Sequence, residues 1–283
     1  MTTCRTAVDI AVQPWFMDHC FNGRAVLPAV ESMCLLAAEI HRSHPEIDIR
    51  IMEHVRFAKF LEIPKGSTSM AALIEHGRDE NGTVRARLLS RERFRTITRL
   101  KEHGEILFPP ARAGSRPAAR DVPAPPAGPV TRISAEEVYR ELVPFGPAYH
   151  TLQETLCLTG KTAWGILQAP ALPAAESVRE IIGSSFPLDG AFHAACVLGQ
   201  RHADFVPFPV GFARRLIARP TQPGGSYLTR VELVSRTRDE LVFNLKIFDG
   251  RGEEYEAVTG VRMRDVSGGR IKPPAWIKTR KAQ

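Results

Sequence analysis

The sequence predicts an α+β protein whose two similar halves each wrap an antiparallel sheet around one apolar helix. A proline-rich stretch divides the 283 residues into two parts, and each part has the size of an ordinary domain. In each part, four short strand-like segments follow one apolar segment of helical period. A sheet that curves around a helix buries most sides of that helix, so one architecture explains both parts.

The first half, residues 1–108, begins with a short predicted strand at 8–12. A helix is predicted from Ala29 to His41, because apolar residues recur there at helical spacing. These apolar residues are Val30, Met33, Cys34, Ala37 and Ile40. Four strands are predicted to follow, at 54–63, 68–77, 83–93 and 94–104. The second and third of these strands are separated by Asp79–Gly82, which has the composition of a hairpin turn.

The second half, residues 131–265, begins with a short predicted helix. Ser134 and Glu137 stand three residues apart at its start, which is the spacing of a capping box. A second, apolar helix is predicted from Leu188 to about Arg201. Strands are predicted before and after this helix, at 151–160, 163–170, 209–220, 226–236, 240–249 and 253–264. The two halves therefore share a pattern of elements rather than a sequence.

Two segments lie outside these halves. Residues 109–130 contain seven prolines among 22 positions, and no apolar period survives there, so a semi-rigid linker is predicted. Residues 266–283 form a basic, proline-containing tail that is expected to end the fold.

Composition excludes several classes of protein. The chain has no apolar run long enough to span a membrane, and its N-terminus lacks the pattern of a secretory signal. Five cysteines without C-x-x-C spacing indicate neither a disulfide framework nor a zinc site, which favours a cytoplasmic location. The net charge of +7 is compatible with an acidic protein partner, whereas no nucleic-acid-binding motif is present. Phosphate-binding loops, dinucleotide fingerprints and serine-hydrolase elbows are absent from the sequence.

The most informative motif is His19-x3-Gly23-x4-Pro28, which lies on a predicted turn before the first helix. Histidine exchanges protons near neutral pH, and backbone N–H groups in such a turn can bind a carbonyl oxygen. Asp189 occupies the corresponding place at the start of the second helix, and His193 follows one helical turn later. If the halves pack side by side, His19 and Asp189 can face one cavity. Cys196 follows His193 at helical spacing, but a buried helix cysteine is more common than a nucleophile.

These residues resemble the motifs of a known family. His19, Gly23 and Pro28 fit its His-x3-Gly-x4-Pro motif, and Asp189 with His193 fits its Asp-x3-Gln/His motif. Residues 145–152 are similar to its Tyr-Gly-Pro-x-Phe segment, and residues 206–212 to its proline-rich strand entry. The chain thus resembles, over about residues 5–265, the dehydratase domain of modular polyketide synthases. The resemblance implies a double hotdog fold.

The resemblance also implies a reaction: loss of water from a 3-hydroxyacyl thioester to give a 2-enoyl thioester. His19 is then the base and Asp189 the acid. Gly23, Pro28, Gly146, Tyr149 and His193 are expected to position the substrate. Burial is expected to keep His19 neutral and to raise the pKa of Asp189 so that it can donate a proton.

The implied partners are an acidic acyl carrier protein and the other enzymes of a polyketide or fatty-acid synthase. The substrate would arrive on the carrier's phosphopantetheine, so no metal or organic cofactor is expected. Homodimers are common in the family. The sequence departs from the family at Phe145, where tyrosine is usual, and at Tyr149, where phenylalanine is usual; Leu142 and Val143 also replace its Gly-Tyr. The alternatives are a double hotdog isomerase, a product-template-like cyclase, or a non-catalytic acyl-binding module.

Overall fold

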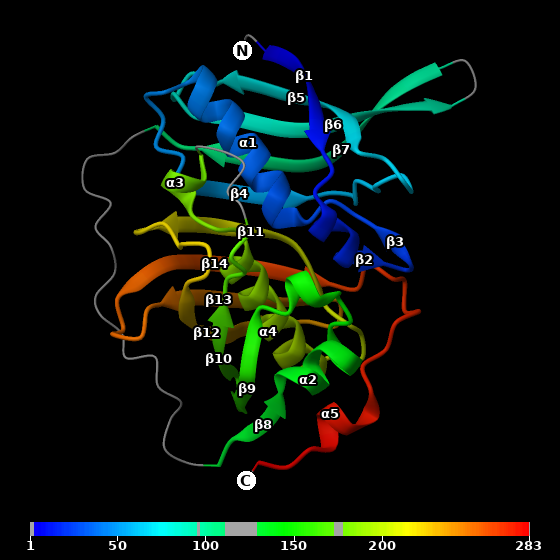
Figure 1. Cartoon of the computed structure of the whole chain (residues 1–283), viewed down its shortest axis with the longest axis vertical. Helices are drawn as coiled ribbons and strands as arrows, with labels where there is room; N and C mark the ends of the chain where they lie inside the picture. The colour runs from blue at the N-terminus through cyan, green and yellow to red at the C-terminus, as the bar shows by residue number, and fades with distance from the viewer. Residues whose placement is uncertain (1–2, 95–96, 111–128, 173–177, 283) are drawn as a thin grey trace.

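The computed structural model describes residues 3–94, 97–110, 129–172 and 178–282. Most of the predicted linker, at 111–128, lies outside the described residues. In the described part the predicted α+β double hotdog is confirmed, because a curved antiparallel sheet encloses one helix in each half (Figure 1). The first half lies around helix α1 and the second around helix α4.

The first half contains one long helix and five long strands. The helix, α1, spans Ala29–Ser43 and packs on β5, β6 and β7 through a face that is almost completely buried. A short helix and a two-stranded hairpin lie between the first strand and α1. In chain order the other elements are β1 (Thr3–Ala11), η1 (Pro14–Asp18), β2 (Cys20–Phe21), β3 (Arg24–Ala25), β4 (Ile51–Phe57), β5 (Ser69–Arg78), β6 (Val84–Phe94) and β7 (Ile97–Phe108).

The second half repeats this plan around α4, which spans Phe186–His202. This helix packs on β9, β10, β12 and β13, so nearly all of its residues are buried. The other elements are β8 (Thr131–Ser134), α2 (Ala135–Glu137), η2 (Val138–Leu142), η3 (Pro147–Tyr149), β9 (Leu152–Thr159), β10 (Thr162–Gln168), α3 (Arg179–Ile182), β11 (Phe208–Ile217), β12 (Ser226–Arg236), β13 (Glu240–Phe248), β14 (Glu254–Arg264) and α5 (Ala275–Thr279).

The two halves share one sheet. Its twelve described strands are ordered β1-β5-β6-β7-β4-β11-β14-β13-β12-β10-β9-β8. The junction is the antiparallel pair of β4 and β11, in which Ile51 lies opposite Leu216 and Arg56 opposite Gly211. Because the sheet is continuous across this junction, α1 and α4 come into contact with each other.

The strand predicted at 54–63 is wrong in its second part. Strand β4 ends at Phe57, and residues 58–62 line a cavity instead. The backbone N–H of Leu27 donates to the Leu61 carbonyl at 2.9 Å, and that of Ile63 donates to the Ala25 carbonyl at 2.8 Å. These bonds to the segment before α1 replace the continuation of the sheet.

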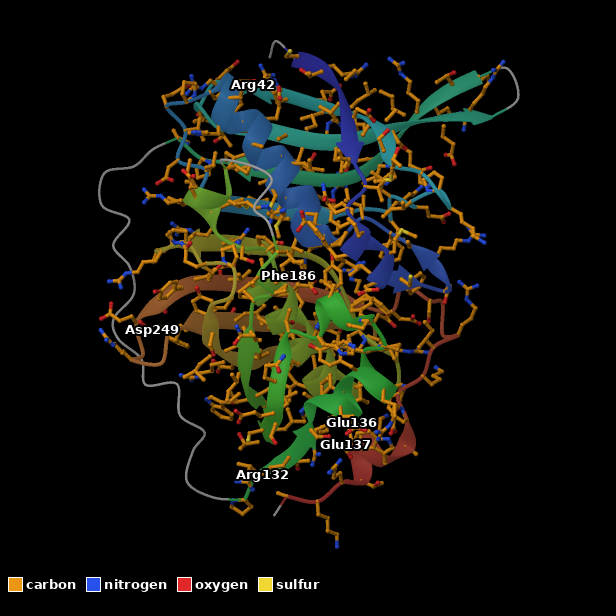
Figure 2. All side chains as sticks on the ribbon, viewed as in Figure 1. Arg42, Arg132, Glu136, Glu137, Phe186 and Asp249 are labelled. Carbon is orange, nitrogen blue, oxygen red and sulfur yellow. The ribbon has the colours of Figure 1, made fainter. Side chains whose placement is uncertain are left out.

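The predicted tail contains the short helix α5, which packs against the second half. Ile277 is completely buried, and Arg280 forms an ion pair with Glu137 at 2.7 Å. The Trp276 indole N–H donates to Glu141 at 2.7 Å. Figure 2 shows Glu136 and Glu137 beside this helix. The capping box predicted at Ser134 and Glu137 is confirmed.

A buried polar cluster joins the two helices. Glu31, in the first turn of α1, accepts a hydrogen bond from Ser185 at 2.5 Å and one from Arg179 at 2.6 Å. Ser185 directly precedes α4, and Arg179 belongs to α3. Removal of one partner from a buried ion pair leaves the other charge poorly solvated, which is strongly destabilising. Loss of one member of the cluster is therefore expected to destabilise the packing of one half against the other.

The substitution Glu31→Ala is expected to lower the free energy of unfolding by about 3 kcal/mol, because it leaves Arg179 without its buried carboxylate. Urea denaturation measures the effect. The matched control is Glu136→Ala, which removes an exposed carboxylate paired with Arg140 and should leave the midpoint unchanged. Equal midpoints for wild type and Glu31→Ala would show that the cluster does not hold the halves together.

Candidate active site

A cavity of about 550 Å³ lies between the two halves. His19 from the first half and Asp189 and His193 from the second all line it. Its volume is within the range of small-molecule sites, and most of its lining is apolar. The structure therefore brings the predicted base, the predicted acid and the neighbour of the acid into one cavity.

The backbone around His19 is fixed on both sides. The His19 N–H donates to the Phe16 carbonyl at 3.1 Å, and the His19 carbonyl accepts from the Val26 N–H at 3.0 Å. The β2–β3 hairpin connects these bonds through Asn22 and Gly23, whose φ angles are 50° and 74°. The space beside Gly23 is open, so its conformation rather than a close contact favours glycine. Pro28 then occupies the N-cap position of α1, without a side-chain capping bond.

A loop from the second half holds the residue before His19. The Gly146 N–H donates to the Asp18 carbonyl, and the Ala148 N–H donates to Asp18 Oδ2, both at 2.8 Å. A Cβ at position 146 would overlap the Asp18 side chain, so this close approach favours glycine. The same loop stacks the Phe145 ring on His19, with centroids 4.3 Å apart and an interplanar angle of 21°.

Asp189 and His193 lie one turn apart on α4 and are both buried. His193 Nε2 is 2.9 Å from Asp189 Oδ2, although the contact is not aligned as a linear hydrogen bond. The other ring nitrogen, Nδ1, lies 3.3 Å from the Tyr139 hydroxyl. The carboxylate thus has an imidazole on its own helix and faces the cavity that His19 also lines.

Electrostatics differ for the two proposed catalytic groups. Burial lowers the pKa of His19 below its ordinary value, although the Asp189 charge opposes this shift. Neutral His19 can accept a proton, as expected from the sequence. For Asp189 the expectation of a raised pKa is wrong. Burial alone would raise it, but His193 and His19 together hold the pKa of Asp189 below its ordinary value. The carboxylate is therefore the favoured form.

Four of the residues expected to position the substrate lie beside the cavity. Gly23, Pro28, Gly146 and Tyr149 are described, but none is among the residues that line it. The buried Tyr149 ring instead contacts the edge of His19, with centroids 5.2 Å apart. These four residues shape or contact the segment that carries His19, so their place favours holding the base over touching the substrate.

Sequence reasoning missed Tyr139 and Asp18. The capping box located the helical segment that carries Tyr139, but no local pattern links this residue to His193, 54 positions away.

Burial raises the pKa of Cys196 to about 12, so this cavity-lining thiol stays protonated and is a poor nucleophile. Among the described residues, no group of three His, Cys, Asp or Glu side chains could hold a metal ion.

The Phe145→Leu substitution is expected to lower the turnover rate about 3- to 10-fold, because the stacked ring that restrains His19 is lost. Phe145→Tyr keeps a ring and should stay within about threefold of wild type. Steady-state kinetics on a 3-hydroxyacyl pantetheine thioester measure both variants. If the leucine variant is as fast as the tyrosine variant, the ring does not order the base.

The chain matches a family model described as the polyketide synthase dehydratase N-terminal domain, over residues 117–271. No curated protein matches the chain. Solved structures do match it. The dehydratase domain of a mycocerosic acid synthase-like polyketide synthase is 15% identical, with 94% of this chain and 92% of that chain covered and a TM-score of 0.74.

Two further solved structures agree. A dehydratase domain of a trans-AT polyketide synthase from Brevibacillus brevis is 16% identical, covers 94% of each chain and has a TM-score of 0.69. A bifunctional dehydratase-cyclase domain in ambruticin biosynthesis is 19% identical, with 93% of this chain and 91% of that chain covered and a TM-score of 0.65. At these identities the structures show a shared fold. No described helix is long and apolar enough to cross a membrane.

Proposed function

We propose, because this chain belongs to the polyketide synthase dehydratase family, that it removes water from a 3-hydroxyacyl thioester to give a 2-enoyl thioester. The observation that supports the proposal is the shared cavity: His19, whose lowered pKa favours the neutral form, and Asp189, whose lowered pKa favours the carboxylate, both line it. Proton abstraction beside a carbonyl requires a neutral base in such a space, and His19 supplies it.

The proposed reaction begins at C2 of the substrate. His19 takes a C2 proton as the C2–H bond breaks, and the electron pair moves toward the thioester carbonyl. At the start of α1 the Glu31 and Ser32 N–H groups donate to the Pro28 carbonyl, which leaves the N–H groups of Ala29 and Val30, and Ala29 lines the cavity. These groups would stabilise the negative charge that develops on the carbonyl oxygen.

The second step breaks the C3–O bond. The proton held by His19 joins the departing hydroxyl to form water, and the electron pair forms the C2–C3 double bond. Asp189 accepts a hydrogen bond from the hydroxyl and so orients it. Its charge also favours the protonated form of His19, which lowers the energy of the intermediate state. This role as a carboxylate replaces the acid role expected from the sequence, because the pKa of Asp189 is lowered.

The proposed substrate arrives on the phosphopantetheine of an acyl carrier protein. Lys59, Lys101 and Lys272 line the cavity, and the chain carries a net charge of +7, which suits an acidic carrier. The proposed reaction consists of two proton transfers and the departure of the hydroxyl as water, with no net oxidation or reduction, so neither a metal nor an organic cofactor is proposed. The enzyme would act with the other activities of a polyketide or fatty-acid-like synthase in the cytoplasm.

Incubation with a 3-hydroxyacyl pantetheine thioester, followed by mass spectrometry, tests this function. A product lighter by one water supports dehydration. A product of unchanged mass would instead support an isomerase or a cyclase, the second activity named for one of the similar structures. Binding without any turnover would support an acyl-binding module. Either of the last two outcomes would overturn the proposed reaction.

A further inference from the structure

Tyr139 lies in an unusual helical segment next to the proposed site. It belongs to the π-helix η2, which continues from the capped helix α2. Single π-turns are rare and frequently occur at functional sites. The Tyr139 ring is 6% exposed and stacks on His150, with centroids 4.2 Å apart and an interplanar angle of 13°. The segment therefore holds the phenol in one orientation.

The hydrogen bonds of Tyr139 determine where its proton goes. The Leu152 backbone N–H donates to the phenolic oxygen at 2.7 Å. Burial raises the pKa of this phenol, so the hydroxyl keeps its proton. His193 Nδ1, at 3.3 Å, is the side-chain nitrogen that can accept that proton in a hydrogen bond.

This donor favours one of the two tautomers of a neutral His193 ring. A neutral imidazole carries one proton, so an Nδ1 that accepts from Tyr139 leaves the proton on Nε2. Nε2 is the nitrogen that lies 2.9 Å from Asp189 Oδ2. The opposite tautomer would place an imidazole lone pair against the carboxylate, which is repulsive.

We infer that the Tyr139 hydroxyl is a positioning group that holds neutral His193 as the Nε2–H tautomer, so that a protonated nitrogen rather than a lone pair lies beside the Asp189 carboxylate. The inference deepens the proposed function and rests on it for the role in catalysis, but the tautomer itself does not depend on turnover. Other titratable groups around the pair are His19 from the first half, Tyr149 from η3 and Cys196 from α4.

Nitrogen-15 NMR of histidine-labelled protein tests the inference directly. The wild-type His193 signals, assigned by their loss in His193→Gln, should show a protonated Nε2 and a bare Nδ1 at neutral pH. Tyr139→Phe should abolish this fixed state and lower kcat about 10- to 100-fold, with KM within about threefold of wild type. The change in kcat without a change in KM is expected because a positioning defect acts on the reacting geometry.

Tyr227→Phe is the matched control. The buried Tyr227 hydroxyl also accepts a backbone N–H bond, from Gln222 at 2.7 Å, but it does not line the cavity. Both variants lose the same kind of bond, so a purely structural effect would appear in both. The amide introduced by His193→Gln can donate to Asp189 and accept from Tyr139, so this variant should keep kcat within about tenfold of wild type.

The outcomes separate the two proposals. A wild-type His193 protonated on Nδ1, or a Tyr139→Phe variant that keeps the Nε2–H form and the wild-type kcat, would overturn the inference. If the wild-type protein shows the expected tautomer but removes no water from the thioester, the proposed function fails and the assignment of the tautomer stands.

Discussion

Replacing His19 with alanine is expected to lower the rate of dehydration by about a thousandfold, within the range that a general base contributes. His19 lines the cavity, is buried, and has a pKa below its ordinary value, so it is neutral at physiological pH. In the proposed reaction it both removes the C2 proton and returns it to the hydroxyl. Single-turnover kinetics on a 3-hydroxyacyl pantetheine thioester measure the chemical step without interference from product release.

The control for this prediction is His202→Gln. His202 lies at the far end of α4, where its Nε2 bonds the Gly160 carbonyl at 2.8 Å, so its loss should leave turnover unchanged. Circular dichroism would establish that both variants are folded. A folded His19→Ala protein with a rate within about tenfold of wild type would show that another group is the base.

Much of the fold was predictable because burial determines the period of the apolar residues. The helix α4 is buried on nearly all sides, and β9, β10 and β13 alternate in burial as strands with one covered face do. The predicted strand at 54–63 failed because hydrogen bonds from Leu27 and Ile63, which bridge distant segments, determine where β4 ends. Such bonds leave no local periodic signal.

The candidate site was predictable in its principal residues but not in its surroundings. His19 and Asp189 could be singled out because each stands before or at the start of the helix of its half, and the two halves share a plan. The lowered pKa of Asp189 could not be foreseen from burial alone. It depends on the close approach of His193 and His19, which only the packed structure provides.

Replacing Asp189 with asparagine is expected to lower the rate of dehydration about 100- to 1000-fold, because an amide cannot stabilise protonated His19 as a carboxylate does. The same single-turnover assay measures the loss. Asp204→Asn is the matched control, since Asp204 follows α4 and is exposed beside Lys278. A wild-type rate of dehydration in Asp189→Asn would show that the Asp189 carboxylate takes no part in the reaction.

The pH dependence of kcat/KM distinguishes the carboxylate role of Asp189 from an acid role. His19 acts when neutral, so its lowered pKa places the loss of activity at a pH below the ordinary histidine value of 6.5. Asp189 as a carboxylate adds no loss as the pH rises, because it stays ionised at every pH above its lowered pKa. An acid role would instead make activity fall as the pH rises through that lowered pKa, before neutrality is reached.

Because the Asp189 charge raises the pKa of His19, the residual activity of Asp189→Asn should persist to lower pH than that of wild type. Two results would support the carboxylate role: a kcat/KM that stays constant through neutral pH, and a loss of activity that occurs at lower pH in Asp189→Asn than in wild type. A kcat/KM maximum confined to acidic pH would instead support the acid role of Asp189.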